Sequence, residues 1–102
     1  MWEITGNWIG EFVKGEWRDN AGICLPPARP VQSRDFDDEK AKTAKWFRFR
    51  LYDADGELYY EGRSTDNKTE AAFDPLEDYG KPNAGAIDIR YFNPDTHEWE
   101  AL

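Results

Sequence analysis

The chain has 102 residues, which is enough for one domain with a modest core and too few for two. Hydrophobic residues make up 39% of it and aromatic residues 16%, so a few large side chains can bury the area that a fold needs. The formal net charge is -8, and the stretch 53–102 alone carries thirteen acids against four bases, a net charge of -9. Such a chain repels nucleic acid and anionic membranes and attracts basic partners.

Cellular location is predicted from what the sequence lacks. No apolar run approaches the roughly 20 residues of a membrane-spanning helix, and the opening Met-Trp-Glu-Ile-Thr-Gly does not have the basic and apolar regions of a secretory signal. A single cysteine, Cys24, cannot form an intramolecular disulfide and fits a reducing compartment. We therefore expect a cytoplasmic protein that does not enter a membrane.

Short strands punctuated by glycines are predicted for residues 2–25, where Trp2 and Ile4 begin an alternating pattern. A further strand-like run covers residues 8–13, and Trp17 and the run 23–25 follow turns at 14–15 and 19–22. Proline then occupies three of the five positions 26–30 and cannot donate ladder hydrogen bonds there. This stretch is expected to be an extended connector or a sheet edge.

Residues 33–45 allow two interpretations. Acids come first and lysines last, which suits a helix dipole, and Ser33 or Asp35 could cap the N-terminus. Phe36 is the only large apolar residue, so little would hold such a helix against a core. Both a short helix and a loop fit the pattern.

A β-hairpin is predicted at about residues 46–62, and the rest of the chain is expected to be organised around it. Phe47, Phe49 and Leu51 alternate with polar residues, which is typical of a half-buried strand, and Leu58 and Tyr60 continue the apolar face after the turn. Residues 53–56 (Asp-Ala-Asp-Gly) have turn chemistry, because Asp bonds its own backbone and Gly adopts positive φ.

The hairpin register follows from side-chain parity. The two apolar faces oppose each other only if the loop has two residues, Asp55-Gly56, or four residues, 53–56. Glu61 then lies opposite Arg50 with the two-residue loop or Arg48 with the four-residue loop. Both registers remain open at this point.

A second, short helix is predicted for Pro75–Tyr79. Asp74 is a preferred N-cap, proline suits the first helical position, and Glu77 completes a pattern like a capping box. Gly80 is expected to end the helix, with a turn at 81–85.

The C-terminal residues, about 86–102, predict a second hairpin around the turn 93–97. Pairing of Asn93 with Glu98 places Phe92 opposite Trp99 and Ile89 opposite Leu102. Ile87, Ile89 and Tyr91 would share one apolar face, and His97 falls where the turn needs positive φ.

The expected fold is therefore mainly β, or α+β at most. It is an antiparallel sheet of five to seven strands, built on the hairpins at about 46–62 and 86–102, with one or two short helices in a single domain, 1–102.

Residues for catalysis or metal binding are sparse. One His and one Cys cannot supply the ligands of a structural zinc site. A calcium loop centred on Gly56 would need acids at Leu51 and Gly62 and fails there. A Cys24–His97 nucleophile pair is weaker than the interpretation of Cys24 as an inert thiol in an apolar run. We predict a non-enzyme with no catalytic residue, no metal and no cofactor.

Residues 46–50 interleave aromatic side chains with arginines, as single-strand nucleic-acid platforms do. Phe47 and Phe49 are needed for the buried face of the hairpin, however, and the following half of the chain is strongly acidic, so direct nucleic-acid binding is not predicted. The five Trp include candidates for a sugar-binding platform, but core and cross-strand packing is the better interpretation, since a domain this small has few other large apolar residues.

The acidic second half of the chain leads to the main functional hypothesis. Alternate carboxylates on a strand lie about 6.6–6.8 Å apart and can resemble a row of phosphates to a basic groove. We expect an acidic interaction protein that binds the basic surface of a nucleic-acid-binding protein, in the manner of phage or plasmid antagonists. The alternatives are an aromatic-rich carbohydrate- or ligand-binding module, a structural domain without a ligand, and an enzyme using Cys24 or a carboxylate pair. The expected partner-binding residues are Asp53, Asp55, Glu57, Glu61, Asp74, Glu77 and Asp78.

Overall fold

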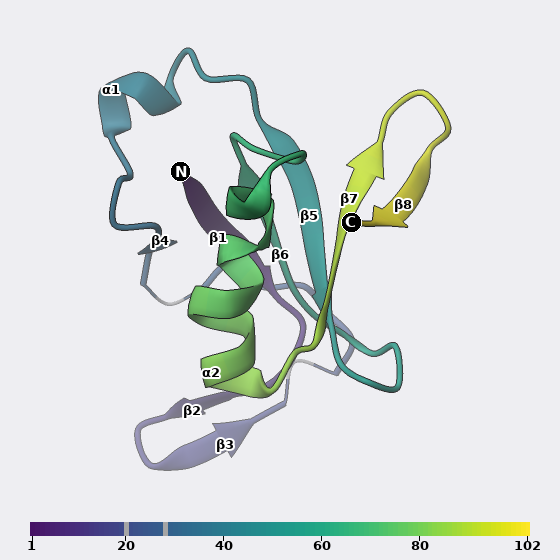
Figure 1. The fold of residues 1–102 in the computed structure, drawn as a ribbon. Helices are drawn as coiled ribbons and strands as arrows, with labels where there is room; N and C mark the ends of the chain where they lie inside the picture. The colour runs from purple at the N-terminus through teal and green to yellow at the C-terminus, as the bar shows by residue number, and fades with distance from the viewer. Residues whose placement is uncertain (20, 28) are drawn as a thin grey trace.

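The computed structural model describes residues 1–19, 21–27 and 29–102. Its main element is a six-stranded antiparallel sheet in the order β4-β1-β6-β5-β7-β8, accompanied by a separate two-stranded ribbon, β2-β3 (Figure 1). The mainly β prediction is confirmed. The strands are β1 (Trp2–Asn7), β2 (Glu11–Val13), β3 (Glu16–Arg18), β4 (Val31–Gln32), β5 (Phe47–Tyr52), β6 (Leu58–Ser64), β7 (Asp88–Asn93) and β8 (Glu98–Ala101).

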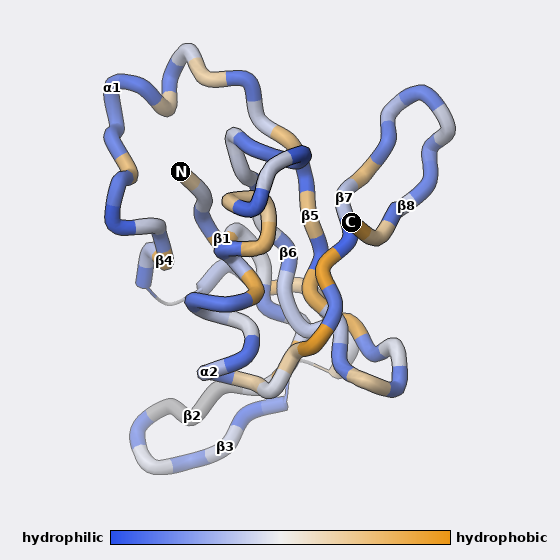
Figure 2. The backbone as a smooth tube through the Cα atoms, viewed as in Figure 1, coloured by the Kyte–Doolittle hydropathy of each residue, from blue (hydrophilic) through white to orange (hydrophobic). Residues whose placement is uncertain are grey.

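Three joined helical segments cover one face of the sheet, and we call them the helical layer (residues 70–84). They are η1 (Glu70–Phe73), η2 (Pro75–Gly80) and α2 (Lys81–Ala84), and Figure 1 shows them running along this face. Hydrophobic residues gather where β5 and β7 pass beneath the layer, whereas the loops are hydrophilic (Figure 2). The buried apolar residues are Trp2, Ile4, Phe49, Leu51, Tyr60, Ala72, Leu76, Ala86, Ile89 and Tyr91.

A glycine lets three strands meet at the centre of this core. Gly62 of β6 pairs with Ile4 of β1 on one side and with Phe49 of β5 on the other. A Cβ atom at position 62 would lie 2.3 Å from the carbonyl oxygen of Glu3 and 2.4 Å from Cζ of Phe49. The ring of Phe49 therefore occupies the place of the missing side chain, as a strand glycine permits where another group approaches closely.

The body of the central hairpin has the register predicted for the two-residue loop, and its tip contains a bulge. Leu51 pairs with Tyr60 and Arg50 with Glu61, as the two-residue loop requires. The register then shifts, so that Tyr52 pairs with Leu58, and a hydrogen bond of 3.0 Å from the N–H of residue 53 to the carbonyl of residue 57 closes a longer loop. The expectation that Leu58 shares a face with Tyr60 is wrong, because the bulge turns it to the opposite face.

The helical layer begins earlier and ends later than predicted. The side chain of Thr69 accepts the first cap hydrogen bond, whereas Asp74 has helical φ and ψ and no side-chain cap. Gly80 does not stop the helical turns, which end at Gly85 with φ of 68°. A Cβ at Gly80 would lie 3.0 Å from the Leu51 side chain, so this glycine serves close packing rather than termination.

The segment 33–45 contains a single helical turn, α1 (Asp38–Ala41), with Asp37 as its N-cap. The Asp37 carboxylate accepts the N–H groups of Glu39 at 2.9 Å and Lys40 at 3.2 Å, so neither predicted cap is used. Phe36 stacks on Trp46 with ring centres 6.1 Å apart. That stacking supplies the anchor that the sequence pattern did not reveal.

The C-terminal hairpin has the predicted pairs of Asn93 with Glu98 and Phe92 with Trp99, and His97 has the expected positive φ of 58°. The predicted pair of Ile89 with Leu102 is not formed, because β8 ends at residue 101 and Leu102 is 46% exposed. Ile87 lies before β7 and is 57% exposed, so it does not belong to the buried face.

The N-terminal strands are confirmed in outline, with Trp2 and Ile4 buried. The predicted run at 23–25 is reduced to one bridge between Asn7 and Leu25, and Ile23 is 60% exposed. Residue 20 of the predicted turn and residue 28 of the proline-rich connector lie outside the described residues. In the part of the chain that the structure describes, no helix has the length and apolarity to cross a membrane.

The core makes a stability prediction. Replacing the fully buried ring in Phe49→Ala should lower the free energy of unfolding by about 3–5 kcal/mol, through lost burial and a residual cavity. The matched substitution Phe73→Ala removes a ring that is 39% exposed and should cost about 1 kcal/mol or less. Urea denaturation followed by tryptophan fluorescence measures both, and equal losses would contradict the assigned core.

Candidate functional site

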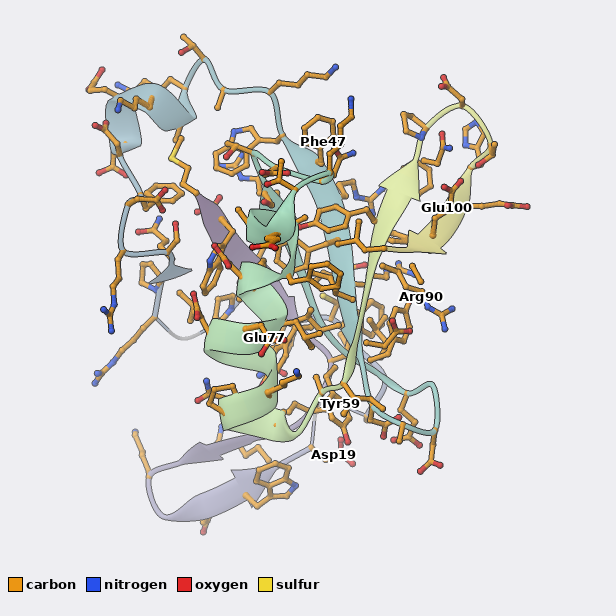
Figure 3. The ribbon with its side chains drawn as sticks, in the orientation of Figure 1. Asp19, Phe47, Tyr59, Glu77, Arg90 and Glu100 are labelled. Carbon is orange, nitrogen blue, oxygen red and sulfur yellow. The ribbon has the colours of Figure 1, made fainter. Side chains whose placement is uncertain are left out.

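The seven acids expected to bind a partner lie in three separate places. Asp53, Asp55 and Glu57 are in the loop at the tip of the central hairpin, and Glu61 is in β6. The other three belong to the helical layer and its first junction, where Figure 3 labels Glu77. Only Glu61 lies within a strand, so the seven do not form the regular row of carboxylates that the strand spacing suggested.

Asp53 builds the hairpin loop. Its carboxylate accepts the N–H of Asp55 at 2.9 Å, the N–H of Glu57 at 2.8 Å and the hydroxyl of Tyr59 at 3.1 Å. The hydrogen bond from the Glu57 backbone, followed by that from Tyr59, holds the pKa of Asp53 below its ordinary value. The Asp53 carboxylate is therefore occupied by hydrogen bonds within the loop, whereas Asp55 and Glu57 are exposed.

Glu61 is neutralised within the sheet. Its carboxylate lies 2.6 Å from Nε of Arg50, and both side chains are largely covered, with 20% and 26% of their surface exposed. Cys24 Sγ lies 3.9 Å from the same carboxylate. Burial and the Glu61 charge raise the pKa of the Cys24 thiol, which disfavours the thiolate that a nucleophile requires.

His97 makes its ring contact in the C-terminal hairpin, where it packs against Phe92 with ring centres 6.0 Å apart. In the described residues no cluster of three His, Cys, Asp or Glu side chains is placed to hold a metal ion. Residues 53–56, which share a short pattern with calcium loops, form the hairpin loop instead.

The sheet face opposite the helical layer, which we call the uncovered face, carries four arginines and four aromatic rings. Three of the arginines are ion-paired: Arg50 with Glu61, Arg63 with Glu3 and Arg90 with Asp88, and Figure 3 shows Arg90 directed away from the helical layer. Each guanidinium also lies over a ring. The distances to ring centres are 4.2 Å from Arg50 to Trp99, 4.1 Å from Arg63 to Trp46, 4.9 Å from Arg90 to Tyr52, and 5.3 Å from Arg48 to both Phe92 and Trp99.

The residues of the motif at 46–50 lie on different faces of the sheet. Phe49 is in the core, whereas Arg48 and Arg50 lie on the uncovered face over rings of the C-terminal hairpin. A nucleic-acid platform stacks bases on aromatic rings and binds phosphates through free cations. Here the chain's own guanidinium groups lie over the rings, and the chain's own carboxylates pair with three of the four cations.

Several acids lie near Asp74 at the start of η2, together with the N-terminal ammonium, which pairs with Asp35 at 3.3 Å. Asp74 is exposed at the surface, but partial desolvation raises its pKa, and the charges of Asp78, Asp35 and Asp66 raise it further, against the N-terminal ammonium, which lowers it. The described residues include no ion pair to Asp74 or Asp78, whereas Glu77 pairs with Lys81 at 2.8 Å. Asp35 and Asp66 were not among the expected site residues, because they join the cluster only through the fold.

Two clefts of comparable size lie at opposite ends of the sheet. One, of about 600 Å³, is flanked by Phe47 and Glu100, which Figure 3 labels near the C-terminal hairpin. The other, of about 550 Å³, lies where the β2-β3 ribbon meets the tip of the central hairpin, and Figure 3 labels its residues Asp19 and Tyr59. Trp17 in this second cleft is 64% exposed. It satisfies the requirement for an accessible indole that a ligand-binding module would have.

Comparison with known proteins adds no relative: no protein-family model, no curated protein and no solved structure matches the chain.

The Asp53 loop predicts a pH dependence of stability. Because the folded pKa is lowered, the stabilisation is present above the unfolded pKa of about 3.9 and is lost as the pH falls through the folded value. The difference in unfolding free energy between the wild type and Asp53→Asn should therefore shrink on acidification. Denaturation across the acidic range measures it. Asp55→Asn, which removes a carboxylate of the same loop with no hydrogen bond among those described, is the matched control variant.

Proposed function

We propose that this chain is a small, acidic, non-enzymatic interaction protein whose helical layer docks on the basic surface of a nucleic-acid-binding protein, as phage- and plasmid-encoded antagonists do. The observation that supports the proposal best is the crowding of like charge at Asp74. Its pKa is raised by partial desolvation and then by Asp78, Asp35 and Asp66, against the N-terminal ammonium. A cationic partner would relieve this repulsion on binding.

The local charge balance favours the same surface. The helical layer, with the junction at residue 74, holds four acids (Glu70, Asp74, Glu77 and Asp78) against one lysine, Lys81. Lys81 pairs with Glu77, so three carboxylates of the layer have no ion-pair partner in the described part of the chain. Exposed charges of one sign raise the rate at which an oppositely charged partner associates and fix its orientation.

The arginines of the second half do not offset this charge at close range. Arg63 and Arg90 lie on the uncovered face, on the other side of the sheet, and each is already paired with a carboxylate there. The proposed docking surface therefore contains the residues Asp74 and Asp78, with Asp66 beside them, whereas Asp35 is already paired with the N-terminal ammonium. Glu61 is left out because Arg50 neutralises it.

The experiment is affinity capture with the folded chain, comparing two variants of equal charge change. Asp74→Asn with Asp78→Asn removes two charges from the helical layer, and Asp55→Asn with Glu57→Gln removes two from the hairpin tip. We expect the first pair to lose most of the captured basic partner and the second to retain it. Purified partner and surface plasmon resonance would then give the affinities.

Two further readouts decide the mechanism. Association must weaken as added salt shortens the Debye length from ~30 Å at 0.01 M to ~8 Å at 0.15 M. Duplex DNA should compete with this chain for the partner. A partner that is indifferent to salt, or one that is lost equally from both variants, would contradict the proposal.

A further inference from the structure

The cleft beside Trp17 combines aromatic walls with an acidic rim. Trp8, Trp17 and Tyr59 line it together with Leu58, and Asp19 and Glu57 contribute carboxylates. Its volume of about 550 Å³ falls within the ordinary range for small-ligand sites. None of these residues belongs to the helical layer.

The rings are held in place by the backbone around them. The N–H of Trp8 donates to the carbonyl of Tyr59 at 2.8 Å, which joins the end of β1 to the bulge of the central hairpin. Trp17 lies against Gly10, where a Cβ would be only 2.6 Å from its ring atom Cζ2. The indole thus packs directly against the backbone at Gly10. This contact restricts its rotation although 64% of the residue is exposed.

The electrostatic field at these rings is negative. The hydroxyl of Tyr59 donates to Asp53 at 3.1 Å. This hydrogen bond and burial raise the pKa of Tyr59, and the charges of Asp53, Glu57 and Asp55 add to the shift. The hairpin-tip acids therefore add negative charge at Tyr59, and Glu57 and Asp19 line the cleft themselves.

The uncovered face provides the internal comparison. Every arginine there lies over an aromatic ring, so the rings Trp46, Tyr52, Phe92 and Trp99 already have a cation of the chain's own. In the described residues no lysine or arginine lies over Trp8, Trp17 or Tyr59. The basic residues of the ribbon, Lys14 and Arg18, are exposed and do not line the cleft.

We propose that this cleft binds an organic cation of the quaternary-ammonium class, either as a free small molecule or as a trimethylated lysine side chain. Aromatic faces attract such cations through their quadrupoles, and quaternary ammonium groups carry no N–H that would need an acceptor. The carboxylates of Asp19 and Glu57 supply the compensating charge. This inference is independent of the docking surface proposed for the helical layer.

The test is a titration of the isotope-labelled full chain by NMR, following the indole N–H signals. Choline is the free-molecule probe, a peptide containing one trimethyllysine is the other, and 3,3-dimethyl-1-butanol is the neutral isostere of choline. We expect saturable shifts of the Trp8 and Trp17 indoles with at least one cationic probe. The neutral isostere should bind about tenfold more weakly, because it lacks the cation–π attraction.

Two variants locate the site. Trp17→Ala should abolish the shifts at Trp8, and the isosteric pair Asp19→Asn with Glu57→Gln should weaken cation binding several-fold without affecting the isostere. The control pair Glu98→Gln with Glu100→Gln makes the same charge change in β8 and should bind as the wild type does.

Each outcome decides the proposal. If neither cation gives saturable shifts up to millimolar concentration, or if the neutral isostere binds equally well, the proposal is wrong. Should Trp17→Ala fail to fold, the Asp19 and Glu57 pair decides alone, since unchanged affinity in that variant would also overturn it.

Discussion

The contact between Phe49 and Gly62 is the constraint on which the rest of the structure depends. Because position 62 has no side chain, β1 and β5 can both approach β6 closely, and the ring of Phe49 lies across the gap. The same ring packs edge-on against Tyr91, with centres 5.8 Å apart. Tyr91 in turn donates its hydroxyl to the carbonyl of Ala72 at 2.7 Å, and its burial raises its pKa to about 12. The contact between the Phe49 ring and Gly62 thus links four strands, β1, β6, β5 and β7, to one another and to the helical layer.

The burial of the core face of the sheet determines which side chains lie on the uncovered face. Side chains alternate along a strand, so each core residue of β5 has an arginine beside it on the uncovered face. An arginine stem can lie on apolar surface while its guanidinium meets both a carboxylate and a ring. Arg50 does this with Glu61 and Trp99. The uncovered face is therefore stabilised by contacts of moderate strength and needs no second layer.

Sequence patterns predicted the parts of the fold that depend on local chemistry. The turn at Gly56, the positive φ of His97 and the pairing of Phe92 with Trp99 follow from turn types and side-chain parity. The bulge that turns Leu58 to the other face was not predictable from local chemistry, because the Tyr59 carbonyl within it accepts the N–H of Trp8, which follows β1 far earlier in the chain. The prediction that Gly80 ends the helix was wrong for a similar reason, since the role of this glycine is set by close packing against Leu51.

The same distinction explains the candidate sites. A list of acids in sequence order treats Glu61 and Asp78 alike, although one is neutralised inside the sheet and the other adds to a field that disfavours ionisation of Asp74. What makes a carboxylate available to a partner is the absence of a cation of the chain's own, and that is a property of the folded surface. Tyr59 illustrates the point for aromatic residues. Beside the bulge that displaces Leu58, Tyr59 lines the same cleft as Trp17, whereas the arginines of the uncovered face lie over other rings.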